Sequence, residues 1–178
     1  MHRESYNAVT EFKNIYIGKH ETGYKILDVG GKETPSGTVP GIGGNYKNIF
    51  PGCTFHVLDF KTEEEGSRDS VPDIIVNGYD WPIDDETYDV VLCGQVFEHD
   101  KFFWLTLNNI KRVLKKDGLA CIVAPSTGGV HRHPIDCYRF FEDSMTAFAE
   151  YMNMELLDVK TYESYFNDVR GVFKKSKG

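Results

Sequence analysis

Residues 26–31, with the sequence ILDVGG, carry the strongest signal of architecture in this chain. An apolar run ends there in Asp28 and Val29, and Gly30 and Gly31 follow. Glycine has no Cβ, so the backbone can turn tightly and a ligand can approach it closely. A short apolar strand followed by a glycine turn is typical of the first strand of an α/β sheet that binds a nucleotide-like ligand.

Apolar runs of strand length recur along the chain and alternate with amphipathic or glycine-rich stretches. They are short, rich in β-branched residues and bounded by Gly, Pro or Asp, and their near-continuous hydrophobicity predicts strands covered on both faces. This alternation predicts an α/β fold with a doubly wound, Rossmann-like, mostly parallel sheet. The expected strands are residues 24–29, 54–60, 73–76, 88–93 and 119–124.

The clearest helix is predicted over residues 100–116. Asp100 stands at the positive end of the helix dipole, Lys115 and Lys116 stand at the negative end, and Gly118 supplies a stop. The apolar residues of this segment recur at helical spacing and form one buried stripe: Phe103, Leu107, Ile110 and Leu114.

The remaining expected elements lie near the two ends of the chain. A helix over residues 142–152 would bury Met145, Phe148 and Met152, and a weaker helix covers residues 4–17. Residues 154–161 and 168–174 are predicted as two strands joined by a polar turn. They would close the sheet as an antiparallel hairpin.

Composition excludes several classes of partner. The chain has 178 residues with 20 Lys+Arg against 27 Asp+Glu, a net charge of −7, and lacks a basic block for nucleic acid. No apolar run approaches the roughly 20 residues of a membrane span, and the first residues have no apolar signal core. The four cysteines form no CxxC pair, so reduced thiols are expected rather than disulfides or a metal finger. We therefore expect a soluble, cytoplasmic protein.

The second expected strand also ends in an acidic residue, Asp59, within the sequence VLDF. A carboxylate at this position can accept hydrogen bonds from both hydroxyls of a ribose. The alternative is a solvated aspartate in a loop.

Four segments in this order resemble the class I S-adenosylmethionine-dependent methyltransferases, in particular the small type 11 group. ILDVGG resembles the first glycine motif of that family, and VLDF resembles its acidic strand end. Residues 77–99, NGYDWPIDDETYDVVLCGQVFEH, are similar to the loop that enters the fourth strand and ends in an EH pair. Residues 111–125, KRVLKKDGLACIVAP, are similar to the helix end and fifth strand.

The resemblance implies S-adenosylmethionine as the cofactor and S-adenosylhomocysteine as its product. It implies one domain over residues 1–178: an N-terminal helix in 1–20, a cofactor-binding core in 24–125, and an acceptor loop, helix and hairpin in 126–178. For Trp81 the alternative is packing in the core. The implied binding residues are Asp28, Gly30 and Gly31 at the methionine end, Asp59 with Phe60 at the ribose, Asn77, Asp80 and Trp81 along the adenine, and Gln95 beside the sulfonium.

The chain departs from the family pattern after the first two glycines. Lys32 and Glu33 stand where a third spaced glycine is usual, and the loop continues with many Gly and Pro residues to residue 45. Such a loop is either a lid over the cofactor or surface padding. Residues 61–71 look too polar for a full helix.

The segment HRHPIDCYRF, residues 131–140, directly follows the fifth expected strand. In an open α/β sheet, ligands bind beyond the carboxyl ends of the strands, so this loop would grip the acceptor. His131 or His133 is the best candidate for a general base, and Asp136 and Arg139 could fix a hydroxyl or an anionic group. Similar segments in the family imply an acceptor related to sugars or surface polymers.

Three other interpretations of this region stay open. His131, His133 and Asp136 could bind a metal, but three ligands this close in one loop without a further His or Cys form a weak site, so no metal is predicted. Asp136 and Arg139 could form an ion pair that only holds the loop. Glu98 with His99 could act as an acid/base pair, orient the cofactor loop or cap the helix that follows.

The sequence therefore predicts a methyltransferase that acts on O or N of a small acceptor. The basic residues of the segment 131–140 favour an anionic acceptor, with no nucleic acid or membrane as partner. The main alternative is a non-catalytic cofactor-binding or scaffold protein of the same fold. A dinucleotide oxidoreductase is disfavoured because no GxGxxG turn is present. No oligomeric state is predicted.

Overall fold

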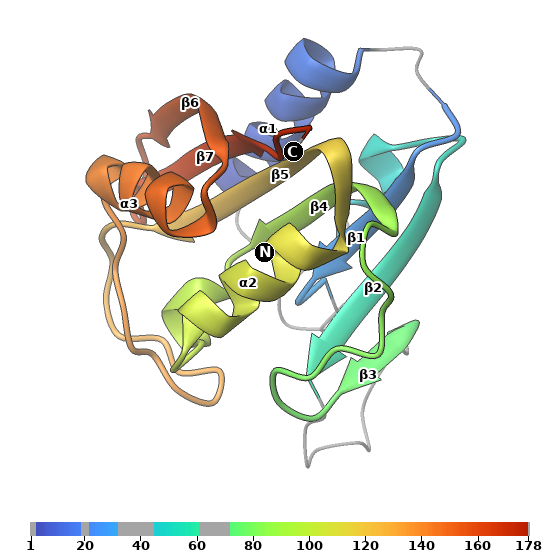
Figure 1. Cartoon of the computed structure of the whole chain (residues 1–178). Helices are drawn as coiled ribbons and strands as arrows, with labels where there is room; N and C mark the ends of the chain where they lie inside the picture. The colour runs from blue at the N-terminus through green and yellow to red at the C-terminus, as the bar shows by residue number, and fades with distance from the viewer. Residues whose placement is uncertain (1–2, 19–21, 32–44, 61–71, 178) are drawn as a thin grey trace.

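The computed structural model describes residues 3–18, 22–31, 45–60 and 72–177, which form a mixed sheet between helices (Figure 1). The sheet has seven strands in the order β3-β2-β1-β4-β5-β7-β6. The first five strands pair in parallel, and β7 pairs antiparallel with both β5 and β6. The strands are β1 Lys25–Val29, β2 Thr54–Phe60, β3 Ile74–Val76, β4 Tyr88–Gly94, β5 Leu114–Pro125, β6 Glu155–Tyr162 and β7 Asp168–Lys174.

This architecture confirms the predicted fold class, including the antiparallel hairpin at the end of the chain. The strand order reverses at β1, which pairs with β2 on one side and with β4 on the other. Ligands of open α/β sheets bind beyond the carboxyl ends of the strands at such a reversal. The candidate site is therefore expected at the carboxyl ends of β1, β2 and β4.

Each face of the sheet is buried under helices, because alternate residues of the central strands point to opposite faces. In β1, Leu27 and Val29 belong to one core, which also contains residues of α2 (Phe103–Val113) and α3 (Glu142–Met152). Ile26 belongs to the other core, with residues of α1 (Arg3–Phe12). The near-continuous hydrophobicity of the strands follows from this double coverage.

The predicted boundary of the helix over residues 100–116 is wrong at its C-terminal end. Helix α2 ends at Val113, and Leu114 is already extended and pairs with Tyr88 of β4. Leu114 continues the apolar stripe at helical spacing, but its buried side chain belongs to the first residue of β5. Lys115 forms an ion pair with Asp89 at 2.8 Å instead of ending a helix.

The start of this segment also differs from the prediction. A short 3₁₀ helix, η3, covers Phe97–His99, and α2 begins after Phe102. Asp100 lies between the two and accepts hydrogen bonds from the Phe102 N–H at 3.0 Å and the Thr106 hydroxyl at 2.6 Å. Asp100 thus ties the two helical segments together.

The other helices agree with the sequence. Helix α3 has the predicted bounds and buries Met145, Phe148 and Met152. The segment 4–17 forms α1 and then a π-helical turn, η1, over Lys13–Ile17, and a 3₁₀ turn, η2, covers Lys47–Ile49. All four cysteines are free thiols. The loop over residues 32–45, predicted as a lid over the cofactor or a plain surface loop, lies mostly outside the described residues. The polar segment 61–71 lies wholly outside them.

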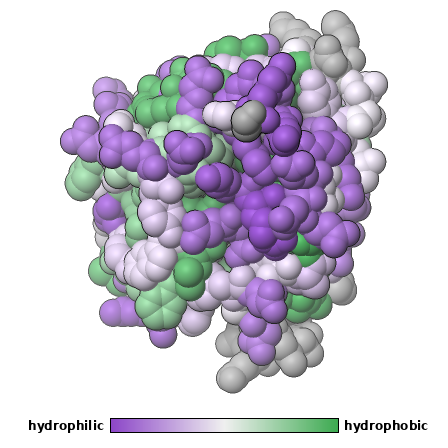
Figure 2. All heavy atoms as spheres, viewed as in Figure 1, coloured by the Kyte–Doolittle hydropathy of each residue, from purple (hydrophilic) through white to green (hydrophobic). Residues whose placement is uncertain are grey.

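The face of the molecule that carries α2 is mostly hydrophilic, as Figure 2 shows. Exposed apolar side chains also occur around the start of α2, at Phe102, Trp104 and Leu105. None of the helices in the described ranges has the length and apolar character needed to cross a membrane.

Candidate active site

The structure brings most of the predicted cofactor-binding residues to one edge of the sheet. Val29 of β1 is level with Leu58 of β2 and with Cys93 of β4, so the residues that follow these strands lie side by side. The Gly30 N–H donates to the Leu58 carbonyl at 2.7 Å, and the Gln95 N–H donates to the Val123 carbonyl at 2.9 Å. These bonds fix the backbone at the point where the strands end.

Asp28 is the most unusual group at this edge. Its side chain is completely buried, and Oδ2 accepts a long hydrogen bond of 3.4 Å from the Tyr46 N–H. Oδ1 has no hydrogen-bond partner among the described residues. Burial, with a smaller contribution from the charge of Asp59, raises the pKa of the Asp28 carboxyl to about 8. A cationic ligand group beside Oδ1 would offset the free-energy cost of burying the charged carboxylate.

The glycines after β1 are required by close packing. A Cβ on Gly31 would lie 2.2 Å from Asp28 Oδ2, and a Cβ on Gly30 would lie 2.4 Å from a methyl carbon of Val96. Gly30 also has a φ of 73°, which disfavours other residues. A third glycine, Gly94 at the end of β4, has the Tyr46 hydroxyl 2.0 Å from the position of a Cβ. The backbone at this edge can therefore approach other groups closely.

Gln95 follows β4 in a strained conformation, with a φ of 60°. Both atoms of its side-chain amide are buried and lack hydrogen-bond partners in the part of the chain that the structure describes. A positive φ in a residue other than Gly, together with an unpaired buried amide, is characteristic of ligand-binding positions. This geometry fits the predicted position of Gln95 beside the reacting groups.

Asp59 and Phe60 end β2 at the same edge. Asp59 Oδ1 accepts a hydrogen bond from the Phe60 N–H at 2.7 Å, which orients the carboxylate. The Phe60 ring lies against the Tyr79 ring, with centroids 6.2 Å apart. The Tyr79 hydroxyl donates to Asp100. Sequence reasoning missed Tyr79, although an aromatic residue shortly after the third strand was a usable signal.

The residues predicted along the adenine separate into two groups. Asn77 and Asp80 are exposed beyond β3. Trp81 is only 3% exposed and belongs to the core under α2 and α3, in line with the packing alternative. Its indole nitrogen has no hydrogen-bond partner within the described ranges.

Asp136 and Arg139 form a bidentate ion pair in the loop that follows β5. The Arg139 guanidinium donates to both carboxylate oxygens of Asp136, at 2.6 and 2.9 Å, and this bonding holds the pKa of Asp136 well below its usual range. The same guanidinium donates to the carbonyls of Gly129 and Tyr138 at 2.9 and 2.7 Å. This arrangement fits the interpretation that the pair holds the loop.

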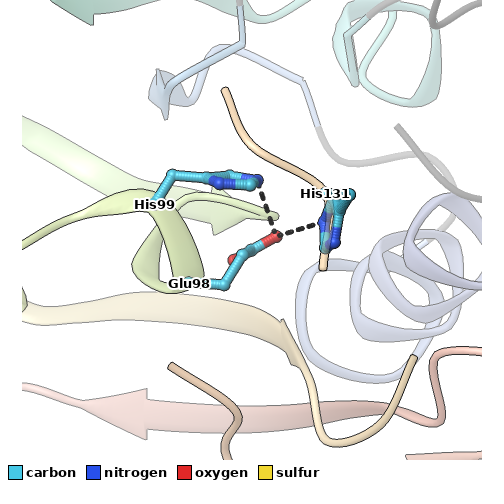
Figure 3. Close-up of side chains that lie close together, drawn as sticks. All are labelled: Glu98, His99 and His131. Atoms are coloured by element: carbon cyan, nitrogen blue, oxygen red, sulfur yellow. Dashed lines mark ion pairs between the residues drawn. The ribbon is translucent and has the colours of Figure 1, made fainter. Parts of the chain in front are cut away.

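The loop that contains this ion pair lies against η3 and brings His131 next to Glu98 and His99 (Figure 3). Glu98 is wholly buried, with Oε1 3.6 Å from His99 Nε2 and 4.0 Å from His131 Nε2. Burial raises the pKa of Glu98 to about 8 and lowers the pKa of His99. His133 is exposed, and its ring centroid is 5.5 Å from that of His99. The sequence paired Glu98 with His99 but could not pair either with His131.

Comparisons with known proteins bear on the fold that positions this site. Residues 52–122 match a family model described as a methyltransferase domain, and a search of the curated proteins found no match. The chain is similar to the crystal structure of the 1,6-didemethyltoxoflavin-N1-methyltransferase of Burkholderia thailandensis, which has 1,6-didemethyltoxoflavin and S-adenosylhomocysteine bound. The TM-score is 0.66 at 14% identity, covering 97% of this chain and 79% of that one.

Two further solved structures extend this similarity. A SAM-dependent methyltransferase from Aquifex aeolicus is 16% identical with a TM-score of 0.62, covering 96% of this chain and 90% of that one. The carbon methyltransferase CurJ is 10% identical with a TM-score of 0.65, covering 98% of this chain and 54% of that one. At these identities the similarity concerns the fold. Residues 52–122 thus match a methyltransferase family model, and the chain as a whole has the fold of the class I methyltransferases.

Proposed function

We propose that this chain is an S-adenosylmethionine-dependent methyltransferase that acts on an oxygen or nitrogen of a small molecule, with a sugar or surface-polymer precursor as the acceptor. The observation that carries this proposal is the buried Asp28 carboxyl, beside the two glycines that follow β1, which has one oxygen without a hydrogen-bond partner among the described residues. The amino group of the methionine part of the cofactor is the kind of cation that this carboxyl would hold.

The residues of the sheet edge fit the rest of the cofactor. Asp59, oriented by the Phe60 N–H, would accept hydrogen bonds from the ribose hydroxyls. Asn77 and Asp80 would lie along the adenine. The Gln95 amide, which has no hydrogen-bond partner among the described residues, would face the reacting groups. When bound, S-adenosylmethionine supplies an activated methyl group on a sulfonium that is a good leaving group.

Catalysis would then depend on how the chain aligns and deprotonates the acceptor. Alignment of a nucleophile with the methyl carbon supplies most of the rate in such a reaction. His133 is exposed in the loop after β5, and we assign to it the role of the base that removes the proton from an acceptor hydroxyl or amine. Asp136 and Arg139 hold this loop in place, and the exposed Arg132 adds a positive charge that favours an anionic acceptor.

Calorimetry tests the cofactor assignment. Titration of the purified chain with S-adenosylhomocysteine should show binding in the micromolar range with one site per chain. The same titration with NAD should show none. Binding of NAD without binding of S-adenosylhomocysteine would overturn the proposal.

A methyl-transfer assay separates the enzyme from a non-catalytic protein of the same fold. The chain is incubated with labelled S-adenosylmethionine and a panel of sugar nucleotides and sugar phosphates, and the products are analysed by mass spectrometry. The His133→Gln variant should bind S-adenosylhomocysteine normally and lose transfer. Normal binding with no transfer to any acceptor in the wild-type chain would favour the non-catalytic alternative.

A further inference from the structure

Three potential metal-ligand atoms converge beyond the carboxyl ends of β4 and β5. Glu98 and His99 lie on η3, and His131 lies in the loop after β5 (Figure 3). One ligand atom from each of the three side chains lies within 4.8 Å of the other two. Figure 3 shows the Glu98 carboxylate between the two imidazole rings.

Both histidines are oriented so that Nε2 faces Glu98. His99 Nδ1 is 2.6 Å from the Ile135 carbonyl, so Nδ1 carries the proton and donates it to that oxygen. His131 Nδ1 is 3.2 Å from the Gly129 carbonyl, 3.5 Å from Asp136 Oδ2 and 3.4 Å from a guanidinium nitrogen of Arg139. Histidines that bind metals are held in this way, with the second ring nitrogen bonded to a carbonyl or a carboxylate.

Among the described residues, no hydrogen-bond donor from another residue explains the burial of the Glu98 carboxylate. Its side chain is 0% exposed, and neither oxygen accepts a hydrogen bond from another described residue. His99 and His131 form ion pairs with it, and the more distant charge of Arg139 also favours its ionised form. Buried carboxylates are normally hydrogen-bonded, paired with a cation or coordinated to a metal.

We propose that Glu98, His99 and His131 bind a divalent first-row transition-metal ion, with Zn²⁺ as the ion that suits them best. Two imidazoles and one carboxylate are a common ligand set for zinc, and for ions such as Fe²⁺ and Mn²⁺. Zinc bonds of about 2.0–2.2 Å place tetrahedral ligand atoms about 3.4 Å apart. The distances from Glu98 are 3.6 and 4.0 Å, and all three atoms lie within 4.8 Å of one another, so side-chain rotations that bring them closer would place them on one ion.

This site differs from the prediction that no metal binds. The prediction considered only ligands within the segment 131–140, whereas the fold contributes two ligands from η3. Three protein ligands leave a coordination position open. If the proposed methyltransferase function holds, that position can bind an oxygen or nitrogen of the acceptor. The metal site itself does not depend on that function.

Metal binding by the full-length chain tests the proposal. After treatment with EDTA and removal of the chelator, titration with ZnCl₂ should show one site per chain with a micromolar or tighter Kd. Co²⁺ in place of Zn²⁺ should give the visible absorption of a nitrogen and oxygen site. Glu98→Gln and His131→Gln should each weaken Zn²⁺ binding at least about tenfold, because loss of even an outer-shell partner has an effect of that size.

Two matched variants control for unspecific binding. His56→Gln changes a histidine on β2 that contacts Tyr88, and Cys137→Ser removes the thiol closest in sequence to the loop ligand His131. Both should bind Zn²⁺ like the wild-type chain. Circular dichroism of every variant shows whether it is folded, and S-adenosylhomocysteine titration of the same samples tests the proposed function separately.

The proposal is overturned by either of two results. One is that the folded wild-type chain binds none of Zn²⁺, Co²⁺ and Mn²⁺ at micromolar concentration. The other is that folded Glu98→Gln and His131→Gln bind Zn²⁺ as tightly as His56→Gln does. Either result would leave the three side chains as an internal ion-pair cluster.

Discussion

Replacing Asp28 with Asn should remove a pH-dependent cost from the stability of the cofactor-free protein. The folded protein raises the pKa of Asp28 to about 8 from an ordinary value of 3.8. Between these values the folded state binds a proton that the unfolded state has lost, so stability falls as pH rises through this window. The uncharged amide of the Asp28→Asn variant does not titrate, so it has no such dependence.

The magnitude follows from the linkage relation. A group that is protonated only in the folded state changes the free energy of unfolding by about 1.4 kcal/mol per pH unit. From pH 5 to pH 7, the stability of Asp28→Asn relative to the wild-type chain should therefore rise by about 3 kcal/mol. Other titrating groups contribute equally to both proteins, so the difference isolates Asp28.

Urea unfolding at pH 5, 6 and 7, without cofactor, measures this difference. The same variant should bind S-adenosylhomocysteine more weakly at pH 7, because the amide cannot pair with an amino group as a carboxylate does. Stability of Asp28→Asn that runs parallel to the wild-type stability at all three pH values would refute the reasoning. It would mean that Asp28 titrates normally in the folded protein.

Three other substitutions probe the same edge of the sheet and the loop beside it. Gly31→Ala should lower stability by about 1–3 kcal/mol in urea unfolding, since its Cβ would lie 2.2 Å from Asp28 Oδ2; unchanged stability would contradict that close approach. Asp59→Asn should weaken binding of S-adenosylhomocysteine about 10–100-fold in calorimetry, the value of hydrogen bonds to a charged group, and normal affinity would exclude a ribose contact. Arg139→Lys keeps the positive charge but loses the bidentate hydrogen bonds to Asp136. Amide hydrogen exchange in residues 129–139 should therefore accelerate while α2 stays protected. Equal exchange in both proteins would show that the pair does not hold the loop.

The sequence was sufficient for the fold because burial on both faces leaves a direct signal in each strand. The predicted segment 54–60 coincides with β2, and 168–174 coincides with β7. The boundary between α2 and β5 was not predictable from spacing. Leu114 extends the apolar stripe of the helix, yet its backbone is extended beside Tyr88, and an apolar residue satisfies either element.

The site was predictable where a residue follows a strand, and less so where a loop folds back. Asp28, Asp59 and Gln95 could be located because parallel strands end at one edge. The contact between Glu98 and His131 depends on the loop after β5, which bonds to η3 through the Cys137 N–H and the Glu98 carbonyl at 2.6 Å. No periodicity in the sequence encodes that contact.

Two acidic side chains are buried near the C-terminal ends of the strands without enough hydrogen bonds or cations from the described residues to stabilise their charge. Asp28 and Glu98 both have raised pKa values because burial disfavours their charge, and both have oxygens without hydrogen bonds to described residues. Stability alone would favour apolar or amide side chains there, since a buried group without a partner lowers it. Their shared position is explained if each pairs with a cation from outside the chain: an amino group at Asp28 and a metal ion at Glu98. On this reasoning the two ligands should each raise the melting temperature, and their effects should be separable, because Asp28→Asn removes only the first and Glu98→Gln only the second.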